Sequence, residues 1–187
     1  FDGISNGSML VTSAPYGQSL RINAGVTRSN GSGVVGTMEF FDGTTLLGTA
    51  TTNANGFATL TTTATQLAAG LHSLYVVYPG SATDASSTSS TVPFTVTPAP
   101  LTVNVANAAK TYGQDDGGTF TGTITGLVGG ESFAASYTSP GSPAGANAGA
   151  YSINAALANQ GTGLLSNYSI TVNPGTLTVT PAALTVT

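Results

Sequence analysis

Apolar and polar residues alternate in short stretches along much of the chain. The clearest stretch is 20–26, where four apolar residues are separated by Arg21, Asn23 and Gly25. Successive side chains of a β-strand point to opposite faces, so this pattern predicts a strand with one apolar face. By the same criterion, seven strands are predicted within residues 6–97, at Met9–Thr12, Gln18–Thr27, Gly36–Phe41, Leu46–Thr52, Gly56–Thr62, Leu71–Tyr78 and Thr91–Thr97.

Turn sequences separate these predicted strands. Asp42-Gly43 and Asn55-Gly56 predict hairpin turns, because Gly, Asn and Asp tolerate the positive φ that such turns need. The alternating residues Leu74, Val76 and Tyr78 are predicted to face the interior. Seven strands in about 90 residues are typical of a β-sandwich, so an all-β fold is predicted for this part of the chain.

A repeated segment divides the chain into domains. Thr97-Pro98-Ala99-Pro100-Leu101-Thr102-Val103 recurs 83 positions later as Thr180-Pro181-Ala182-Ala183-Leu184-Thr185-Val186. A period of that length corresponds to a whole domain, since solenoid repeats run about 20–50 residues. We therefore expect a first domain at 1–97, a second at 98–181 and the first strand of a further repeat at 182–187. Because proline restricts the backbone, the connection between the domains is predicted to be short and semi-rigid.

The second predicted domain, 98–181, shows the same β-rich pattern. Its last part consists of two apolar–polar alternations joined at Asn173-Pro174-Gly175, which predicts a terminal hairpin.

The composition agrees with this architecture and narrows the function. The chain has 32 Thr, 19 Ser, 25 Gly and 9 Pro, which favour strands and turns, and it has few strong helix formers. Only 5% of the residues are charged, against about 25% in a typical soluble domain. The basic residues Arg21, Arg28 and Lys110 are too few to bind nucleic acid or to attach the chain to an anionic lipid surface.

Other residue types are scarce as well. The chain has one histidine, His72, and no cysteine, which removes most zinc, iron–sulfur, haem and thiol chemistry. No apolar run approaches 18 residues, so no membrane-spanning helix is predicted. A surface rich in Thr, Ser and Gly favours an exported protein, with a cytosolic protein of unusual composition as the alternative. Residues 1–5 do not resemble a signal peptide, so an export signal is expected outside this segment.

Several segments of the first domain carry a family resemblance. They are Pro15-Tyr16-Gly17-Gln18-Ser19, residues 36–50, Leu67-Ala68-Ala69-Gly70-Leu71-His72-Ser73 and Tyr78-Pro79-Gly80-Ser81-Ala82. Together they resemble the bacterial Ig-like repeat domain of large surface proteins, over nearly the whole of 1–97. The resemblance implies an extracellular β-sandwich that serves as a spacer or adhesive module, without catalytic residues. Many such repeats carry Ser-Gly-Asp near 79–82, so any role of that aspartate is lost here or moves to Asp84.

The second domain carries a different resemblance. Lys110-Thr111-Tyr112-Gly113 stands near its start, and Asn167-Tyr168 precedes the predicted hairpin near its end. In this order the segments resemble the MBG domain, a glycine-rich, mostly-β repeat of bacterial adhesins and haemagglutinin-like proteins. The resemblance implies a small sheet in a β-grasp-like arrangement with at most one short helix, which we place near 127–135.

Few carboxylates are placed for catalysis or metal binding. Asp115-Asp116 is the only adjacent pair among seven acidic residues. Neighbours in a Gly-rich loop point in different directions and stay solvated, so a glycosidase pair is not expected. Calcium prefers about six to eight oxygen ligands, so two carboxylates predict at most a weak calcium contact.

The basic residues offer two further hypotheses. His72 could serve a hydrolase triad, but no nucleophile elbow supports this, and a surface or hydrogen-bonded strand histidine is favoured. Lys110 could form an intramolecular isopeptide bond with an asparagine, but it is predicted to lie in a turn without apolar shielding, which disfavours the reaction. Arg21 and Arg28 are predicted to be solvated.

Aromatic rings could bind a sugar without any charge. Tyr75 is predicted on the face opposite Leu74 and Val76, and Phe41 on the face opposite Phe40, which makes both rings candidates for exposure. Cross-strand packing of aromatic side chains is the favoured interpretation.

The sequence thus predicts a spacer segment of a large secreted or cell-surface bacterial protein, of the adhesin type. We expect an elongated monomeric tandem of about 80 Å, whose partners are neighbouring repeats, with an extracellular glycan or protein as a further candidate. No catalytic residue, cofactor or metal site is predicted. A carbohydrate- or protein-binding module and an accessory domain of an exported enzyme are the alternatives.

Overall fold

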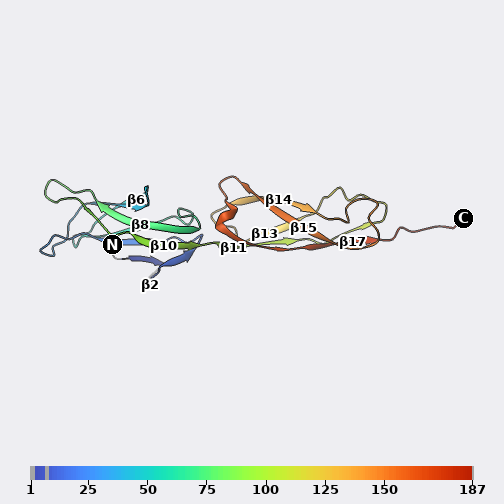
Figure 1. The fold of residues 1–187 in the computed structure, drawn as a ribbon, viewed down its shortest axis with the longest axis horizontal. Coiled ribbons are helices and arrows are strands. Elements are labelled where there is room, and N and C mark those ends of the chain that lie inside the picture. Colours follow the sequence, from blue (N-terminus) through green and yellow to red (C-terminus); the bar gives the residue numbers. More distant parts are fainter. Residues whose placement is uncertain (1–2, 7–8, 187) are drawn as a thin grey trace. The chain divides into compact units, whose positions relative to one another are not determined.

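The structure is a computed structural model, and it describes residues 3–6 and 9–186. The chain divides into two compact units, Phe1–Ala99 and Pro100–Thr187. Both units are built from strands (Figure 1), which confirms the predicted all-β class.

Unit 1 contains two sheets. The first has the strand order β2-β1-β4-β7 and consists of β1 (Gly3–Asn6), β2 (Met9–Leu10), β4 (Arg21–Gly25) and β7 (Phe57–Thr61). The second has the order β3-β10-β8-β5-β6, with β9 paired to β8, and consists of β3 (Ser13–Pro15), β5 (Thr37–Asp42), β6 (Thr45–Thr51), β8 (Gly70–Tyr78), β9 (Ser87–Thr88) and β10 (Val92–Thr97).

Alternating side chains from both sheets form the core of unit 1. Ile22 of β4, Phe40 of β5, Leu74 of β8 and Phe94 of β10 are each at most 1% exposed. Burying a side chain of this kind contributes roughly 1.5–3 kcal/mol. The predicted inward face of β8 is confirmed, because Val76 and Tyr78 are also buried.

Two details of unit 1 differ from the prediction. The segment predicted as one strand at Met9–Thr12 contributes only Met9–Leu10, and β3 follows in the other sheet, where it pairs in parallel with β10. Asn55-Gly56 does form a tight turn, in which Gly56 N donates to Asn53 O. This turn is not a hairpin, because it joins β6 and β7, which belong to different sheets. Asp42-Gly43 lies in the β5–β6 hairpin as predicted.

Unit 2 also contains two sheets. One has the order β13-β11-β16 and consists of β11 (Ala99–Val105), β13 (Gly122–Thr125) and β16 (Tyr168–Asn173). The other has the order β12-β17-β15-β14 and consists of β12 (Ala108–Thr111), β14 (Ser132–Thr138), β15 (Gly149–Gln160) and β17 (Gly175–Thr180). The shared core includes Val103 from the first sheet and Ile153 and Leu177 from the second, all fully buried.

The predicted terminal hairpin of unit 2 is wrong. Strands β16 and β17 lie in different sheets, so the chain passes from one sheet to the other at Pro174. A single residue between the strands leaves no room for a two-residue hairpin turn. The same crossing occurs between β11 and β12, and β12 then pairs in parallel with β17.

The short helix expected near 127–135 is also wrong. Gly129 and Gly130 have φ of 59° and 76°, which a right-handed helix does not permit, and β14 begins at Ser132. In the described residues the only helical segment is the 3₁₀ turn η1 (Leu165–Asn167), and unit 2 is a pair of sheets in place of the implied β-grasp. Nor is any helix in the described part of the chain long and apolar enough to cross a membrane.

The repeated segment occupies two different environments. Leu101 and Val103 of β11 are both 0% exposed, whereas the matching Leu184 and Val186 are 92% and 100% exposed. No strand is assigned to 181–186. That 182–187 begins a further repeat therefore stays a prediction.

Candidate functional site

A pocket of about 660 Å³ lies at one end of the unit 1 sandwich. Its walls come from residues 24–29 at the end of β4, from Val76 and Tyr78 at the end of β8, and from the loop 83–89. Strand β8 runs from Gly70, which pairs with Val96, toward Tyr78. The pocket is therefore at the end of unit 1 remote from the last residues of β10.

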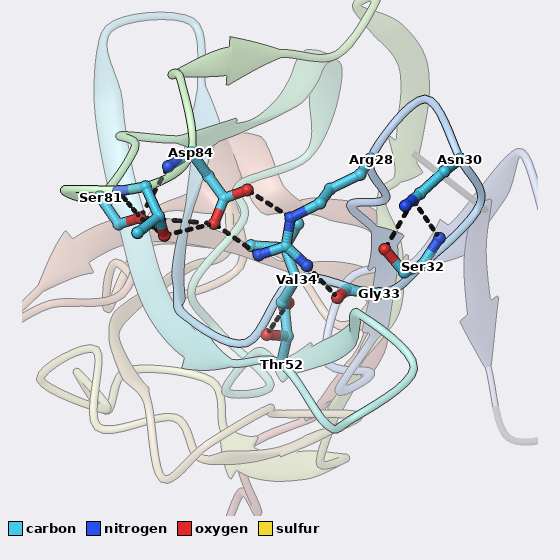
Figure 2. Close-up of polar contacts among 9 residues, drawn as sticks. Arg28, Asn30, Ser32, Gly33, Val34, Thr52, Ser81 and Asp84 are labelled. Atoms are coloured by element: carbon cyan, nitrogen blue, oxygen red, sulfur yellow. Dashed lines mark hydrogen bonds and ion pairs between the residues drawn. The ribbon is translucent and has the colours of Figure 1, made fainter.

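Arg28 and Asp84 form a bidentate ion pair at this pocket (Figure 2). Nε of Arg28 lies 2.6 Å from Oδ1 of Asp84, and its Nη2 lies 2.8 Å from Oδ2. Nη1 of Arg28 donates to the carbonyl of Gly33 at 3.2 Å. The guanidinium thus joins the loop after β4 to the loop after β8. Arg28 is solvated as predicted, with a side chain that is 43% exposed, and the ion pair with Asp84 is an additional contact.

The ion pair changes the titration of both groups. The hydrogen bond to Asp84 raises the pKa of Arg28, and the hydrogen bond from Arg28 lowers the pKa of Asp84. Asp84 is further supported by Thr83, whose hydroxyl donates to Oδ2 at 3.0 Å, and by its own N–H, which donates to the hydroxyl oxygen of Ser81. The side chain is therefore held in place by its neighbours.

The loop that carries Arg28 is closed by its own hydrogen bonds. Arg28 N donates to Ser32 O, and Gly31 N donates to Arg28 O. Oδ1 of Asn30 accepts from both the N–H and the hydroxyl of Ser32, as Figure 2 shows. These local hydrogen bonds hold the loop around Arg28 in a defined turn.

Tyr78 lines the pocket and has a buried hydroxyl. The residue is 3% exposed, and its hydroxyl has no hydrogen-bond partner among the described residues. An unpaired buried polar group costs about 1–3 kcal/mol. The ring packs against Gly36, where a Cβ atom would come within 2.7 Å of the ring carbon Cε2. Gly36 therefore makes room for the tyrosine.

His72 is the only histidine, and both of its ring nitrogens are engaged. Nδ1 lies 2.7 Å from Oδ2 of Asp42, and Nε2 lies 2.8 Å from the carbonyl of Ala68. Asp42 also accepts from the backbone N–H of Ser73. This confirms a hydrogen-bonded strand histidine. In a hydrolase triad Nε2 would instead contact a serine hydroxyl.

The first residues carry the spacing of a nucleophile elbow without its geometry. Gly3-Ile4-Ser5-Asn6-Gly7 has the spacing Gly-x-Ser-x-Gly. Ser5 lies within β1 and pairs with Leu10 and Arg21. A nucleophile elbow needs a sharp turn from a strand into a helix, so this segment does not form one.

Lys110 is the single lysine or arginine of unit 2, and it is buried. It lies in β12, is 7% exposed, and its Nζ donates to the carbonyl oxygens of Gln114, Ser142 and Pro143 at 3.0, 2.6 and 2.6 Å. The prediction that it lies in a turn is wrong. An ammonium group has three N–H donors, and the three carbonyls use all of them. The side chain of an asparagine that formed an isopeptide bond with Lys110 would have to occupy the place of these backbone oxygens.

The segment from Thr111 to Gln114 forms a turn, which accounts for its glycine. Gln114 N donates to Thr111 O, and Gly113 has φ of 88°, as the third residue of a type II turn requires. Gln114 Oε1 accepts from Thr111 N. The Lys-Thr-Tyr-Gly-Gln segment thus closes on itself and offers the Gln114 carbonyl to the ammonium.

The Asp115-Asp116 loop does not gather metal ligands. Oδ1 of Asp115 accepts from Gly117 N, and Oδ1 of Asp116 accepts from Gly118 N. Within the described residues no three acidic, histidine or cysteine side chains come together to hold a metal ion. A weak calcium contact therefore stays a prediction without structural support.

Phe41 and Tyr75 stack on each other across β5 and β8. Their ring centroids are 5.1 Å apart and the rings are nearly parallel, at 10°. The residues are register partners, and both are half-buried. Cross-strand packing, the favoured interpretation, is what the structure contains.

A second aromatic cluster lies in unit 2. The hydroxyl of Tyr168 donates to Oε2 of Glu131 and accepts from the backbone N–H of Val128. Its ring packs edge-on against Phe133. Burial and the hydrogen bond to Glu131 raise the pKa of Tyr168 to about 12. Sequence patterns did not indicate this cluster.

Two solved structures are similar to the chain at low identity. InvD of Yersinia pseudotuberculosis has 18% identity and a TM-score of 0.35, over 94% of this chain and 57% of that one. A C-terminal 282-residue fragment of intimin, in complex with the intimin-binding domain of the translocated intimin receptor, has 16% identity and a TM-score of 0.33, over 91% of this chain and 61% of that one. The chain thus spans less than two thirds of either structure.

Family models match both units. No curated protein matches the chain significantly. Residues 9–97 match the bacterial Ig-like domain (group 3), and residues 101–178 match the MBG domain (YGX type), in agreement with both resemblances and with Tyr112-Gly113-Gln114. The chain therefore belongs to these two families, as a bacterial Ig-like domain followed by an MBG domain.

Proposed function

We propose that the chain is a spacer segment of a large secreted or cell-surface bacterial protein of the adhesin type. The family that unit 1 matches is a bacterial Ig-like domain, and both units are built from strands. The proposed role is mechanical: each unit adds length, and the Pro98–Pro100 connection limits bending between units.

The path of the chain through unit 2 is the observation that carries this proposal. The first strand, β11, begins at Ala99, the chain runs through β11 and β12 to Thr111, and the last strand, β17, ends at Thr180, which pairs with Thr111. Thirteen residues from Ala99 to Thr111 correspond to about 40 Å of extended chain. The points where the chain enters and leaves are thus at opposite ends of the unit, and such units lengthen an array when repeated.

The charge distribution supports the same role. Only 10 of the 187 residues are acidic or basic, and one of the three cations, Lys110, is buried among backbone carbonyls. Little charge remains on the surface for recognising an ionic partner. A hydroxyl-rich surface keeps such a segment hydrated without attracting charged molecules.

Small-angle X-ray scattering of the 187-residue chain tests this role. A rod of about 80 Å has a radius of gyration of about 23 Å, whereas a compact chain of this length has about 16 Å. A variant in which Pro98 and Pro100 are both glycine is the matched control, and its distance distribution should broaden. A compact particle for the unmodified chain would refute the spacer proposal.

A binding module is the second candidate, and the unit 1 pocket is the observation that favours it. The aromatic pair offers a separate surface for a glycan. A glycan array comparing the chain with its Tyr75→Ala variant tests that surface, and signals that survive the substitution would place binding elsewhere.

A further inference from the structure

We propose that the pocket of unit 1 binds a neutral sugar residue. This role goes beyond the spacer function and does not depend on it. Three segments distant in sequence build the pocket, so it exists only in the folded domain.

The size of the pocket suits a small ligand. Its volume of about 660 Å³ lies within the range of roughly 300–1,000 Å³ found for small-molecule sites. A pocket of this volume accommodates one or two pyranose rings.

The charges around the pocket select for a neutral ligand. Arg28 and Asp84 are the only charged residues among the described residues that line it, and each neutralises the other. An anion would have to compete with Asp84 for the guanidinium, and a cation would have to compete with Arg28 for the carboxylate. A ligand without charge meets neither penalty.

The rest of the lining combines hydroxyl groups with an apolar wall. Serine and threonine residues line the pocket, with Thr27 and Ser29 after β4 and Ser87 and Thr88 in β9. Val34, Met38 and Val76 supply the apolar part. A sugar ring has the same two characters, since hydroxyls project from its edge and C–H groups cover its faces.

The hydroxyl of Tyr78 is the group to which the ligand would hydrogen-bond. This hydroxyl is buried and lacks a hydrogen-bond partner among the described residues. Arg28 lines the same pocket, and its side chain is 43% exposed. The proposal places a hydroxyl of the bound sugar on this phenol.

The test measures binding of named sugars by the full 187-residue chain in solution. N-acetylglucosamine, galactose, glucose and lactose are titrated into ¹⁵N-labelled protein, and the acidic sugar N-acetylneuraminic acid is titrated in parallel. We expect a neutral sugar to shift the amide signals of residues 24–29 and 83–89. The Tyr78→Phe variant should lose about tenfold in affinity, the size expected for one hydrogen bond.

Ser73→Ala is the matched control, because it removes an exposed hydroxyl from the same strand outside the pocket lining. Its affinity should equal that of the unmodified chain. Thermal unfolding of both variants shows whether unit 1 remains folded. Three results would overturn the proposal: no shifts with any neutral sugar at millimolar concentration, equal affinity in Tyr78→Phe, or stronger binding of the acidic sugar.

Discussion

The side-chain Nζ of Lys110 donates a hydrogen bond of 2.6 Å to the backbone carbonyl of Ser142, 32 positions along the chain. Two further carbonyls, of Gln114 and Pro143, complete the surroundings of the ammonium. Gly113 N also donates to Ala144 O, so the turn after β12 and the loop 139–146 are fastened together at one point. A buried charge thus organises two loops of the MBG unit.

Lys110→Met should destabilise unit 2 by about 3 kcal/mol. Methionine has a similar length but leaves three carbonyl oxygens without their charged donor, and such unpaired buried groups are costly. Urea unfolding followed by amide signals measures the two units separately. Unit 1 serves as the internal control, and its transition should not move. A loss below about 1 kcal/mol would mean that water replaces the ammonium.

The intact mass of the chain should equal the mass expected from its sequence. An isopeptide bond between Lys110 and an asparagine would remove ammonia and lower the mass by about 17 Da. All three acceptors of Nζ are backbone carbonyl oxygens, and none of these can form that bond. Electrospray mass spectrometry of the denatured protein decides the question, and a mass deficit would contradict the structure.

Local patterns in the sequence predicted strands better than they predicted sheets. Alternation placed Ile22 and Leu74 in the core correctly, because side-chain direction depends on neighbouring residues alone. Whether two consecutive strands pair with each other is decided by distant partners. Both Asn55-Gly56 and Asn173-Pro174-Gly175 resembled hairpin turns, yet each joins strands of different sheets.

The candidate site was less predictable for the same reason. Arg28 and Asp84 are 56 positions apart, and neither lies in a motif that indicates the other. The sequence also gives no indication that the Tyr78 hydroxyl lacks a hydrogen-bond partner. The alternating pattern predicts only that Tyr78 faces the interior. Lys110 is predicted to lie in a turn, but strand β12 includes it and continues to Thr111. In all three cases the side-chain environment is created by tertiary contacts.

Unit 1 should lose stability in acid through Asp84. The hydrogen bond from Arg28 lowers the pKa of Asp84 below 3.8. The contribution of ionised Asp84 to the stability of unit 1 is therefore fully present above pH 3.8, and it disappears as pH falls through the lowered pKa. Thermal unfolding measured between about pH 5 and pH 2 should therefore show a steeper decline for the unmodified chain than for Asp84→Asn. Asp115→Asn, in unit 2, should leave the unit 1 curve unchanged. Identical acid profiles for Asp84→Asn and the unmodified chain would argue against the ion pair.

Unit 2 should lose stability at alkaline pH through Tyr168. The pKa of Tyr168 is raised from 10.0 to about 12 in the folded chain. As pH rises, the phenol therefore loses its proton in the unfolded chain before it does so in the folded chain. The free energy of unfolding should fall as pH rises from 10 to about 12, and Tyr168→Phe should remove this decline. Ultraviolet absorbance of phenolate follows the titration of the seven tyrosines, and Tyr168 should titrate above pH 10. The difference spectrum between the unmodified chain and Tyr168→Phe isolates the Tyr168 phenol. Titration of this phenol near pH 10 would contradict its contact with Glu131.

Tyr78→Phe should increase the stability of unit 1 by up to about 1 kcal/mol. The substitution removes a buried hydroxyl that has no partner among the described residues, and it keeps the ring that packs against Gly36. Tyr151→Phe is an informative contrast in unit 2, because its hydroxyl donates to Asn147 O at 2.9 Å and its loss should cost up to about 1 kcal/mol. Differential scanning calorimetry measures both variants in the absence of sugar. A clear loss of stability in Tyr78→Phe would show that water occupies the pocket beside the phenol, and a sugar would then have to displace that water in order to bind.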